Sequence, residues 1–260
     1  MVKIFNTDCI AGMQKRLPDG CIDVIVTSPP YNLGIKYGTY NDHSPRQEYL
    51  EWMFDVAHEM YRVLSDDGSL FLNLGSKPTD PWVAYDVLNE FRRLFNLQNQ
   101  FIWVKAISVE DTEGNIRSHG HRKPLNSKRF EDDCWEFIFH LTRTGDVQLD
   151  KLALGVPYAD KRNVKRYGKE FDLRNRGNTW FIPYKTSQLK ENDQPHPAIF
   201  PDQLATNCLL LHGRDKIRFA LDPFMGTGST GIACQKLGID CVGFDIDPGY
   251  CELAKERLHG

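Results

Sequence analysis

The sequence predicts an α/β fold in which helices cover both faces of a mostly parallel sheet. Apolar, strand-like runs alternate with amphipathic helical patterns at both ends of the chain, and this alternation is typical of the three-layer α/β class. The 260 residues, 41% of them hydrophobic, suffice for one large core or two unequal ones. Only 29 residues (232–260) follow Gly231, so the N-terminal strands must complete the sheet.

The individual elements follow from the spacing of apolar residues. Residues 48–64 repeat apolar side chains, among them Leu50, Met53, Ala57 and Met60, at helical spacing. The pair Asp67-Gly68 is expected to form a turn before the next strand. In chain order the predicted strands are 1–6, 22–26, 69–74, 100–105, 134–141, 217–221 and 240–244, and the further helices are 81–95, 202–211, one ending at 237, and 248–258.

A rigid polar turn, Thr-Ser-Pro-Pro-Tyr-Asn at 27–32, ends the buried strand 22–26. Two prolines fix φ at about −65° and remove two N–H donors, so the local carbonyls are expected to point outward, free to accept. Acceptors beside an aromatic ring suit a planar substrate that carries an amino group, as cytosine and adenine do. The candidate catalytic residues are therefore Ser28, Pro29, Pro30 and Tyr31.

A glycine-rich motif at 221–231 follows a second apolar strand and opens a helix. Gly226, Gly228 and Gly231 have the G-x-G-x-x-G spacing, and Asp245 ends the next strand. This pattern alone fits a nicotinamide-dinucleotide site. A P-loop is excluded, because the lysine of its G-K-[ST] motif is missing.

The charge around the glycines argues against the dinucleotide. A pyrophosphate needs a neutral or positive loop at the helix N-terminus, yet Asp222 lies just before the glycines and no Lys or Arg occurs between Arg218 and Lys236. S-adenosylmethionine fits better, because it is cationic, carries a ribose and has no phosphate. Asp245 would then bind the ribose hydroxyls.

Together these motifs resemble those of the DNA amino-methyltransferases, which methylate the exocyclic nitrogen of cytosine or adenine. The resemblance spans almost the whole chain in the order of the permuted beta class, with the catalytic motif before the cofactor motif. It rests on 6–9 (Asn-Thr-Asp-Cys), 27–32, 196–201 (His-Pro-Ala-Ile-Phe-Pro) and 221–231. It implies a three-layer, Rossmann-like, S-adenosylmethionine-dependent methyltransferase fold that is circularly permuted and carries an inserted target-recognition region.

The resemblance also implies the cofactor site. Asp8 has the family's position for the adenine amine, although an Asp before a helix is also a common N-cap. Asp247 is interpreted as a cap of the last helix and is left out of the site. No metal site is expected, since His119 and His121 lack ligand partners at suitable spacing. The cofactor residues are Asp8, Cys9, Phe200, Asp222, Pro223, Phe224, Gly226, Thr227, Gly228, Ser229 and Asp245.

The charge is distributed unevenly along the chain. The net charge is −3, yet residues 151–190 hold ten Lys or Arg against three acids, which favours a phosphate-facing surface. We expect residues 109–195 to form the inserted DNA-binding region, with 134–141 returning to the core sheet. Residues 1–108 and 196–260 would form the catalytic and cofactor-binding domain. The predicted DNA-binding residues are Arg122, Lys123, Lys165, Arg166 and Lys169.

The expected reaction follows from the substrate. An exocyclic amine is a poor nucleophile and is paired inside a duplex, so the base must be extruded and held on Tyr31. Ser28 and the Pro29 carbonyl would accept the amine hydrogens and direct the nitrogen lone pair at the sulfonium methyl for in-line transfer, without a covalent intermediate. The rate would come mainly from positioning.

The target base is less strongly defined. Ser before Pro-Pro-Tyr is commoner in the N4-cytosine enzymes of the family, and this favours N4-cytosine over N6-adenine. Carbon-5 methylation is excluded, because no Pro-Cys dipeptide occurs. An RNA or protein-glutamine methyltransferase and a non-catalytic nucleic-acid binder remain as other classes.

Composition points to an intracellular protein. Seven cysteines are scattered singly without a C-x-x-C, as in reduced proteins. No apolar run approaches the roughly 18 residues of a membrane span, and no secretory signal is expected at the N-terminus. We expect a cytoplasmic enzyme that acts on double-stranded DNA alongside a cognate restriction endonuclease, either as a monomer or as a homodimer.

Overall fold

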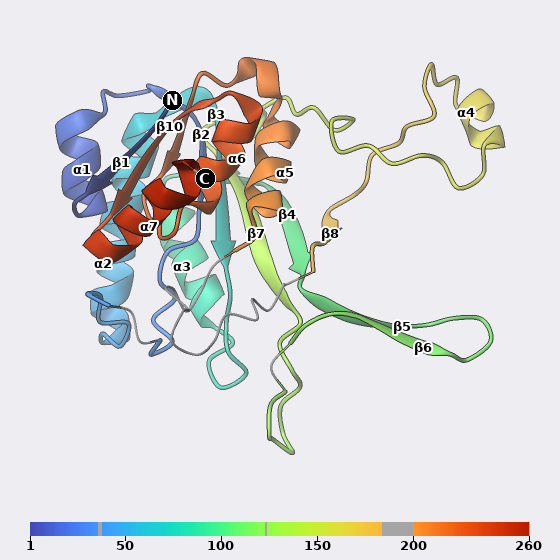
Figure 1. Cartoon of the computed structure of the whole chain (residues 1–260), viewed down its shortest axis with the longest axis horizontal. Helices are drawn as coiled ribbons and strands as arrows, with labels where there is room; N and C mark the ends of the chain where they lie inside the picture. The colour runs from blue at the N-terminus through green and yellow to red at the C-terminus, as the bar shows by residue number, and fades with distance from the viewer. Residues whose placement is uncertain (36–37, 123, 184–199, 260) are drawn as a thin grey trace.

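A computed structural model describes residues 1–35, 38–122, 124–183 and 200–259. Across these residues an eight-stranded sheet forms the centre of the molecule (Figure 1). Its strands, in spatial order, are β1 (Val2–Asn6), β10 (Asp240–Asp245), β9 (Phe219–Asp222), β2 (Ile22–Thr27), β3 (Leu64–Leu74), β7 (Trp135–Thr142), β4 (Asn96–Val104) and β8 (Thr179–Phe181).

One strand of this sheet runs against the others. β7 pairs antiparallel with both β3 and β4, whereas β1, β10, β9, β2 and β3 pair parallel, as do β4 and β8. The start of β7 therefore lies at the edge where its neighbours end. The mostly parallel sheet confirms the predicted α/β class.

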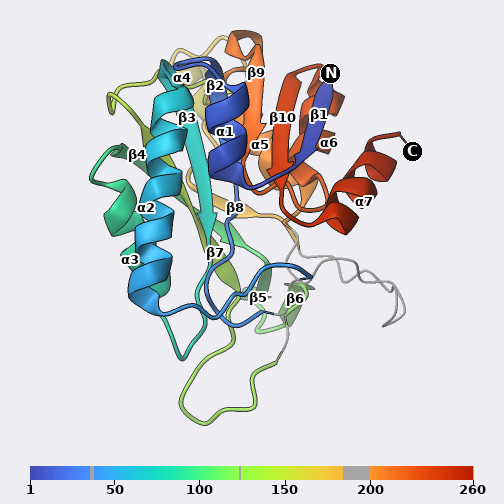
Figure 2. The ribbon, with the colours of Figure 1, turned by 90° about the vertical axis from the view of Figure 1, so that its left-hand side faces the viewer.

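Helices cover both faces of the sheet (Figure 2). On one face α1 packs against α2 and α2 against α3, while on the other α6 packs against both α5 and α7. Within the described residues no helix is both long and apolar enough to cross a membrane. The bounds are α1 (Cys9–Arg16), α2 (Arg46–Val63), α3 (Val83–Phe91), α5 (Asp202–His212), α6 (Ser229–Leu237) and α7 (Pro248–His259).

Each face has its own hydrophobic core, because alternate strand residues point to opposite sides. Leu70 and Leu72 of β3 join the core beneath α1, α2 and α3, whereas Phe71 joins the core beneath α5 and α6. In the central strand β2 all six residues are buried, as expected for a strand covered on both faces. The two cores fix the sheet rigidly between the helical layers.

One expectation was wrong in detail. Asp67-Gly68 lies inside β3, beside a register shift against β2, rather than in a separate turn. Within the range 109–195, Trp180 is 1% exposed and packs on Phe101 in the core.

The polar region after β4 contains regular structure that the sequence pattern did not show. A two-stranded hairpin, β5 (Ala106–Glu110) and β6 (Ile116–Gly120), projects from the body, and a short helix, α4 (Arg162–Arg166), lies on a second extension (Figure 1). β7 lies within the main sheet and covers most of the predicted strand 134–141.

A buried carboxylate joins the two halves of the sheet. Asp222, at the end of β9 and 1% exposed, accepts hydrogen bonds from Thr27 Oγ1 and Thr230 Oγ1, both at 2.7 Å. It also accepts from the backbone N–H of Phe224 at 3.0 Å. These bonds tie the end of β2, the start of α6 and the loop between β9 and α6 to one side chain.

Burial raises the pKa of Asp222 to about 6, although the three donors oppose this shift. Since the folded-state pKa lies above the ordinary value of 3.8, folding favours the protonated form. That contribution to stability is complete below about pH 4 and is lost as the pH rises through about 6.

We expect Asp222→Asn to remove this pH dependence. The free energy of unfolding of the wild type, relative to the variant, should fall by about 2.4 kcal/mol between about pH 4 and pH 7. Denaturant unfolding at several pH values measures the difference. A difference that stays constant over this range would show that the pKa of Asp222 is ordinary.

Candidate active site

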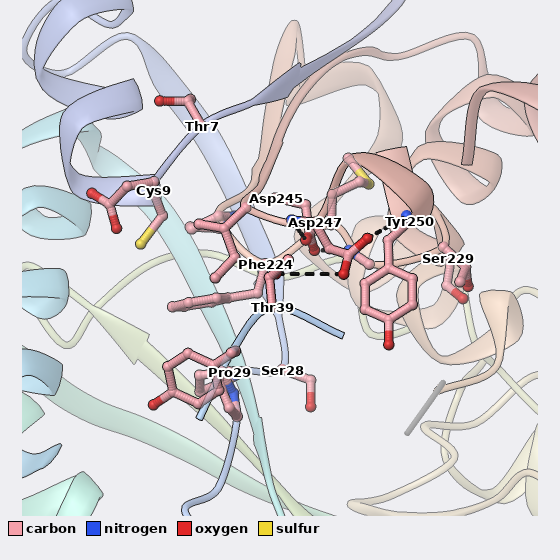
Figure 3. A pocket seen from close by; sticks show the side chains of 18 of the residues that line it. Thr7, Cys9, Ser28, Pro29, Thr39, Phe224, Ser229, Asp245, Asp247 and Tyr250 are labelled. Carbon is pink, nitrogen blue, oxygen red and sulfur yellow. Dashed lines mark hydrogen bonds between the residues drawn. The ribbon is translucent and has the colours of Figure 1, made fainter. Parts of the chain in front are cut away.

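A cavity opens where the carboxyl ends of β2, β9 and β10 meet. The chain leaves β2 toward β3 but leaves β9 toward β10, on the opposite side, and such a divergence point is the usual ligand site of an open α/β sheet. Figure 3 shows Asp245, Asp247 and Tyr250 on one side of it and Ser28 and Pro29 on the other. The lining is Thr7, Asp8, Cys9, Ser28, Pro29, Pro30, Tyr31, Thr39, Tyr40, Trp52, Phe200, Pro223, Phe224, Met225, Gly226, Thr227, Ser229, Asp245, Ile246, Asp247 and Tyr250.

The structure thus brings both sequence motifs to one cavity. All four predicted catalytic residues line it, and so do nine of the predicted cofactor residues. The other two lie outside the lining. Asp222 is buried beneath the loop, and Gly228 precedes α6, where an added Cβ would lie 3.1 Å from Ala254 of α7. Residues 196–199 of the predicted His-Pro motif lie outside the described residues.

The shape of the catalytic turn depends on a residue that sequence reasoning missed. Asp42, 2% exposed, accepts from the backbone N–H groups of Asn32, Leu33 and Ile35 at 2.8, 3.0 and 3.0 Å. Asn32 has φ 57°, a left-handed conformation that asparagine tolerates better than most residues. Its side chain exchanges two 2.9 Å hydrogen bonds with the backbone of Ser44. The turn is therefore held rigidly from one side.

The carbonyls of the turn are not all free, as we had expected from the two prolines. The Pro30 carbonyl accepts from Tyr49 Oη at 2.7 Å. Among the hydroxyls, Ser28 Oγ lies 2.7 Å from Tyr31 Oη, which donates to Glu136 Oε2 at 3.2 Å. The hydroxyl of Tyr31 thus belongs to a chain of hydrogen bonds, whereas the sequence predicted a role only for its ring, as a stacking surface for the base.

Asp245 organises the glycine loop. Its Oδ2 accepts from Gly226 N and its Oδ1 from Asp247 N, both at 2.8 Å. Burial raises the pKa of Asp245, and these two N–H donors oppose the shift. Gly226 has φ 49°, a left-handed conformation that glycine adopts without the strain that a Cβ would bring. A carboxylate has about four acceptor sites, so Asp245 can still bind a ligand hydroxyl.

An aromatic wall closes another side of the cavity. Phe224 contacts Trp52 of α2 edge-on with ring centroids 5.7 Å apart, and Tyr40 lies 5.7 Å from Trp52. Only Phe224 was predicted. Trp52 could have been noticed as a large aromatic residue within an amphipathic helix, but its sequence position does not reveal the cavity.

Asp8 and Asp247 each bond to the first turn of a helix and also line the cavity. Asp8 Oδ1 accepts from Ala11 N at 3.0 Å and caps α1. Asp247, which we had left out of the site, accepts from the N–H groups of Gly249 and Tyr250 at the start of α7 and also lines the cavity. For both residues, a role as a helix cap is therefore compatible with a role in the site.

The charge of the cavity is negative. Asp8, Asp245 and Asp247 line it, and among the described lining residues there is no Lys, Arg or His. No group of three or more His, Cys, Asp or Glu side chains in the described part of the chain is placed to hold a metal ion. Burial and the nearby Asp8 raise the pKa of the Cys9 thiol. The cavity therefore suits a cationic ligand and disfavours a pyrophosphate.

Of the predicted DNA-binding residues, the four that the structure describes are not part of the cavity lining. Lys165 and Arg166 belong to α4, and Lys169 follows it, all of them exposed. Arg122 follows β6 and pairs with Asp132 at 3.1 Å. Lys123 lies outside the described residues.

Comparisons with known proteins agree with this site. Residues 22–256 match the family of N6- and N4-methyltransferases described as DNA methylase. The type II methyltransferase M.HpaI of Haemophilus parainfluenzae is 29% identical over 244 residues, which cover 94% of this chain and 70% of that protein.

Two solved structures share the fold. The cytosine-N4-specific PvuII DNA methyltransferase aligns with a TM-score of 0.72 and 17% identity, covering 98% of this chain and 86% of that one. The complex of M1.HpyAVI with S-adenosylmethionine aligns with a TM-score of 0.60 and 18% identity, covering 99% and 100%. Because the family match spans most of the chain, the predicted resemblance is confirmed: the protein belongs to the DNA methylase family of N6- and N4-methyltransferases.

Proposed function

We propose that this protein transfers a methyl group from S-adenosylmethionine to the exocyclic N4 of cytosine in double-stranded DNA. One observation carries the proposal. The turn from Ser28 to Tyr31 and the loop around Gly226 line the same cavity, so an amine held by the first can face a methyl donor held by the second.

The cavity supports the choice of cofactor. S-adenosylmethionine carries an ammonium and a sulfonium, which three lining carboxylates attract and which aromatic faces such as Trp52 and Phe224 also favour. Asp245 would accept hydrogen bonds from the ribose hydroxyls while it holds the glycine loop. A nicotinamide dinucleotide would instead place its pyrophosphate beside these carboxylates.

The catalytic turn supports an amino target. A flipped base stacked on Tyr31 would offer its amine to Ser28 Oγ and the Pro29 carbonyl, since the Pro30 carbonyl is already bonded to Tyr49. In the transfer the N–C bond would form as the S–C bond of the cofactor breaks, sulfur would keep the electron pair, and the methylated amine would give one proton to solvent water. Positioning and fixed acceptors supply most of the rate.

The choice of N4-cytosine rests on Ser28, and N6-adenine is the alternative within the family. Digestion of methylated DNA to nucleosides, followed by mass spectrometry, decides between them. Detection of 4-methylcytosine supports the proposal, and 6-methyladenine replaces it with the alternative. A 5-methylcytosine product would show that the active site has been placed wrongly.

Residues 109–195 are our proposed target-recognition region. The support is the charge of 151–190 and the two extensions that project from the body beside the catalytic domain (Figure 1). The lysines and arginines of α4 and its flank would bind phosphate, while a cognate endonuclease would share the same recognition sequence without direct contact.

We expect Asp245→Ala to weaken S-adenosylmethionine binding roughly 10- to 100-fold, since one charge-assisted hydrogen bond contributes about 1.5–3 kcal/mol. Isothermal titration calorimetry measures this. A cofactor analogue without ribose hydroxyls is the control, because the smaller loss of affinity for it measures the effect of the disturbed glycine loop alone. Unchanged cofactor affinity, or tight binding of a nicotinamide dinucleotide, would contradict the assignment.

We expect Tyr31→Ala to lose most single-turnover methylation while cofactor affinity stays normal. Base stacking contributes about 1–3 kcal/mol, and its loss also misplaces the amine. Tyr31→Phe should fall between Ala and the wild type, because it keeps the ring and loses the hydroxyl. Ser28→Ala should also lower turnover. Full activity in Tyr31→Ala would mean that the turn is only structural.

We expect duplex DNA binding to weaken steeply with salt. Replacing Lys165, Arg166 and Lys169 together by Gln should reduce the slope of log K against log[salt] by about 3 at most, one for each phosphate contact. Fluorescence anisotropy at several salt concentrations measures the slope. The matched control replaces Lys3, Lys15 and Arg92, exposed residues on other elements, and equal slopes for both triple variants would exclude α4 from the interface.

A further inference from the structure

Glu136 lies outside every sequence motif, yet it reaches the catalytic turn. It is the second residue of β7, opposite Trp103 of β4, and its neighbour Phe137 pairs with Leu74 at the end of β3. Because β7 runs against its neighbours, its first residues lie where theirs end. Glu136 Oε2 accepts from Tyr31 Oη at 3.2 Å.

The carboxylate is fixed by two further donors. Lys105, which follows β4, donates from Nζ to Glu136 Oε1 at 2.9 Å, and the two side chains are only 20% and 16% exposed. Asn73 of β3 donates from Nδ2 to Glu136 Oε2 at 2.9 Å and also to the Phe137 carbonyl. Oε1 therefore faces a cation, and Oε2 faces Tyr31 and Asn73.

A close approach of backbone and ring completes this arrangement. A Cβ added at Gly75, directly after β3, would lie 2.8 Å from the Tyr31 ring and 3.2 Å from the Glu136 carboxyl carbon. Glycine at this position leaves the space in which the tyrosine ring lies beside the glutamate.

Because Glu136 accepts hydrogen bonds, it fixes which group donates in the contacts of Tyr31 with Glu136 and of Ser28 with Tyr31. An ionised carboxylate only accepts, and a phenol has a single proton. Tyr31 gives that proton to Glu136, so at the 2.7 Å contact between Ser28 and Tyr31 the serine must donate. The proton of Ser28 thus points at Tyr31, and its lone pairs remain for a donor in the cavity.

We propose that Glu136 is a positioning residue that makes Ser28 a hydrogen-bond acceptor toward the exocyclic amine of the target base. This inference rests on the proposed function. The amine carries two protons and needs an acceptor. A serine whose proton pointed into the cavity would oppose it.

The test is Glu136→Gln, which keeps the shape of the side chain and reverses the direction of its hydrogen bond with Tyr31. Lys105 requires an acceptor, so the amide oxygen takes the place of Oε1 and the amide NH2 group takes the place of Oε2, where it faces Tyr31. Asn73 then loses its acceptor at this position but keeps its hydrogen bond to the Phe137 carbonyl. Tyr31 then accepts from the amide and donates to Ser28, whose proton turns toward the amine. Single-turnover methylation of duplex DNA should fall roughly 10- to 100-fold, the effect of one charge-assisted hydrogen bond, with unchanged affinities for S-adenosylmethionine and DNA.

The same substitution in the Tyr31→Phe variant distinguishes this positioning role from a role in stabilising the fold alone. In Tyr31→Phe the connecting hydroxyl is absent, so adding Glu136→Gln should cause no further loss. The matched control is Glu59→Gln on α2, a buried glutamate paired with Arg62 and remote from the cavity lining. It should leave turnover unchanged.

The outcomes are distinct. A loss in the wild-type background that disappears in Tyr31→Phe supports the inference. Full turnover of Glu136→Gln, or the same loss in both backgrounds, overturns it while the wild type still methylates DNA. If the wild type forms no methylated nucleoside, the proposed function fails and the inference falls with it.

Discussion

The site depends on the hydrogen bonds of one buried carboxylate. Asp222 joins Thr27, the last residue of β2, to Thr230 in the first turn of α6. The first lies directly before the catalytic turn and the second directly after the glycine loop. Asp222 therefore fixes the distance between the loop proposed to hold the methyl acceptor and the loop proposed to hold the methyl donor. It does so although it is buried and does not line the cavity. Asp42 and Asp245 then shape the two loops above it.

The sequence predicted the fold well where apolar periodicity is strong. The helix α2 and the central strands are long or fully buried, and their patterns have a single interpretation. Nine of the ten residues of the hairpin β5–β6 are exposed and only Ala106, at its base, is buried, so the hairpin has no buried face by which its strands could be predicted. β8 has only three residues, of which one, Trp180, is buried, so its pattern is too short to predict a strand.

The residues of the candidate site that could be predicted are those that belong to the two short sequence motifs. Both motifs lie at the ends of adjacent strands, and most of their residues line one cavity. Trp52 and Tyr250 were missed because each reaches the cavity from a helix whose pattern is explained by packing alone. Tyr40 was missed because it lies in the loop between β2 and α2, outside any motif. Glu136 was missed for a different reason, since its place depends on the antiparallel direction of β7, and an apolar run does not reveal its direction.

The reversed strand has a further consequence for how such proteins diversify. The connection from β4 to β7, residues 105–134, starts and ends at the same edge of the sheet (Figure 1), and Glu136, just after it, contacts Tyr31 of the catalytic turn. Chain inserted there emerges next to the catalytic turn and leaves every pairing of the sheet unchanged. The connection can therefore change in length and sequence while the sheet that carries both loops of the cavity stays the same, which would let our proposed target-recognition region diverge independently of those loops.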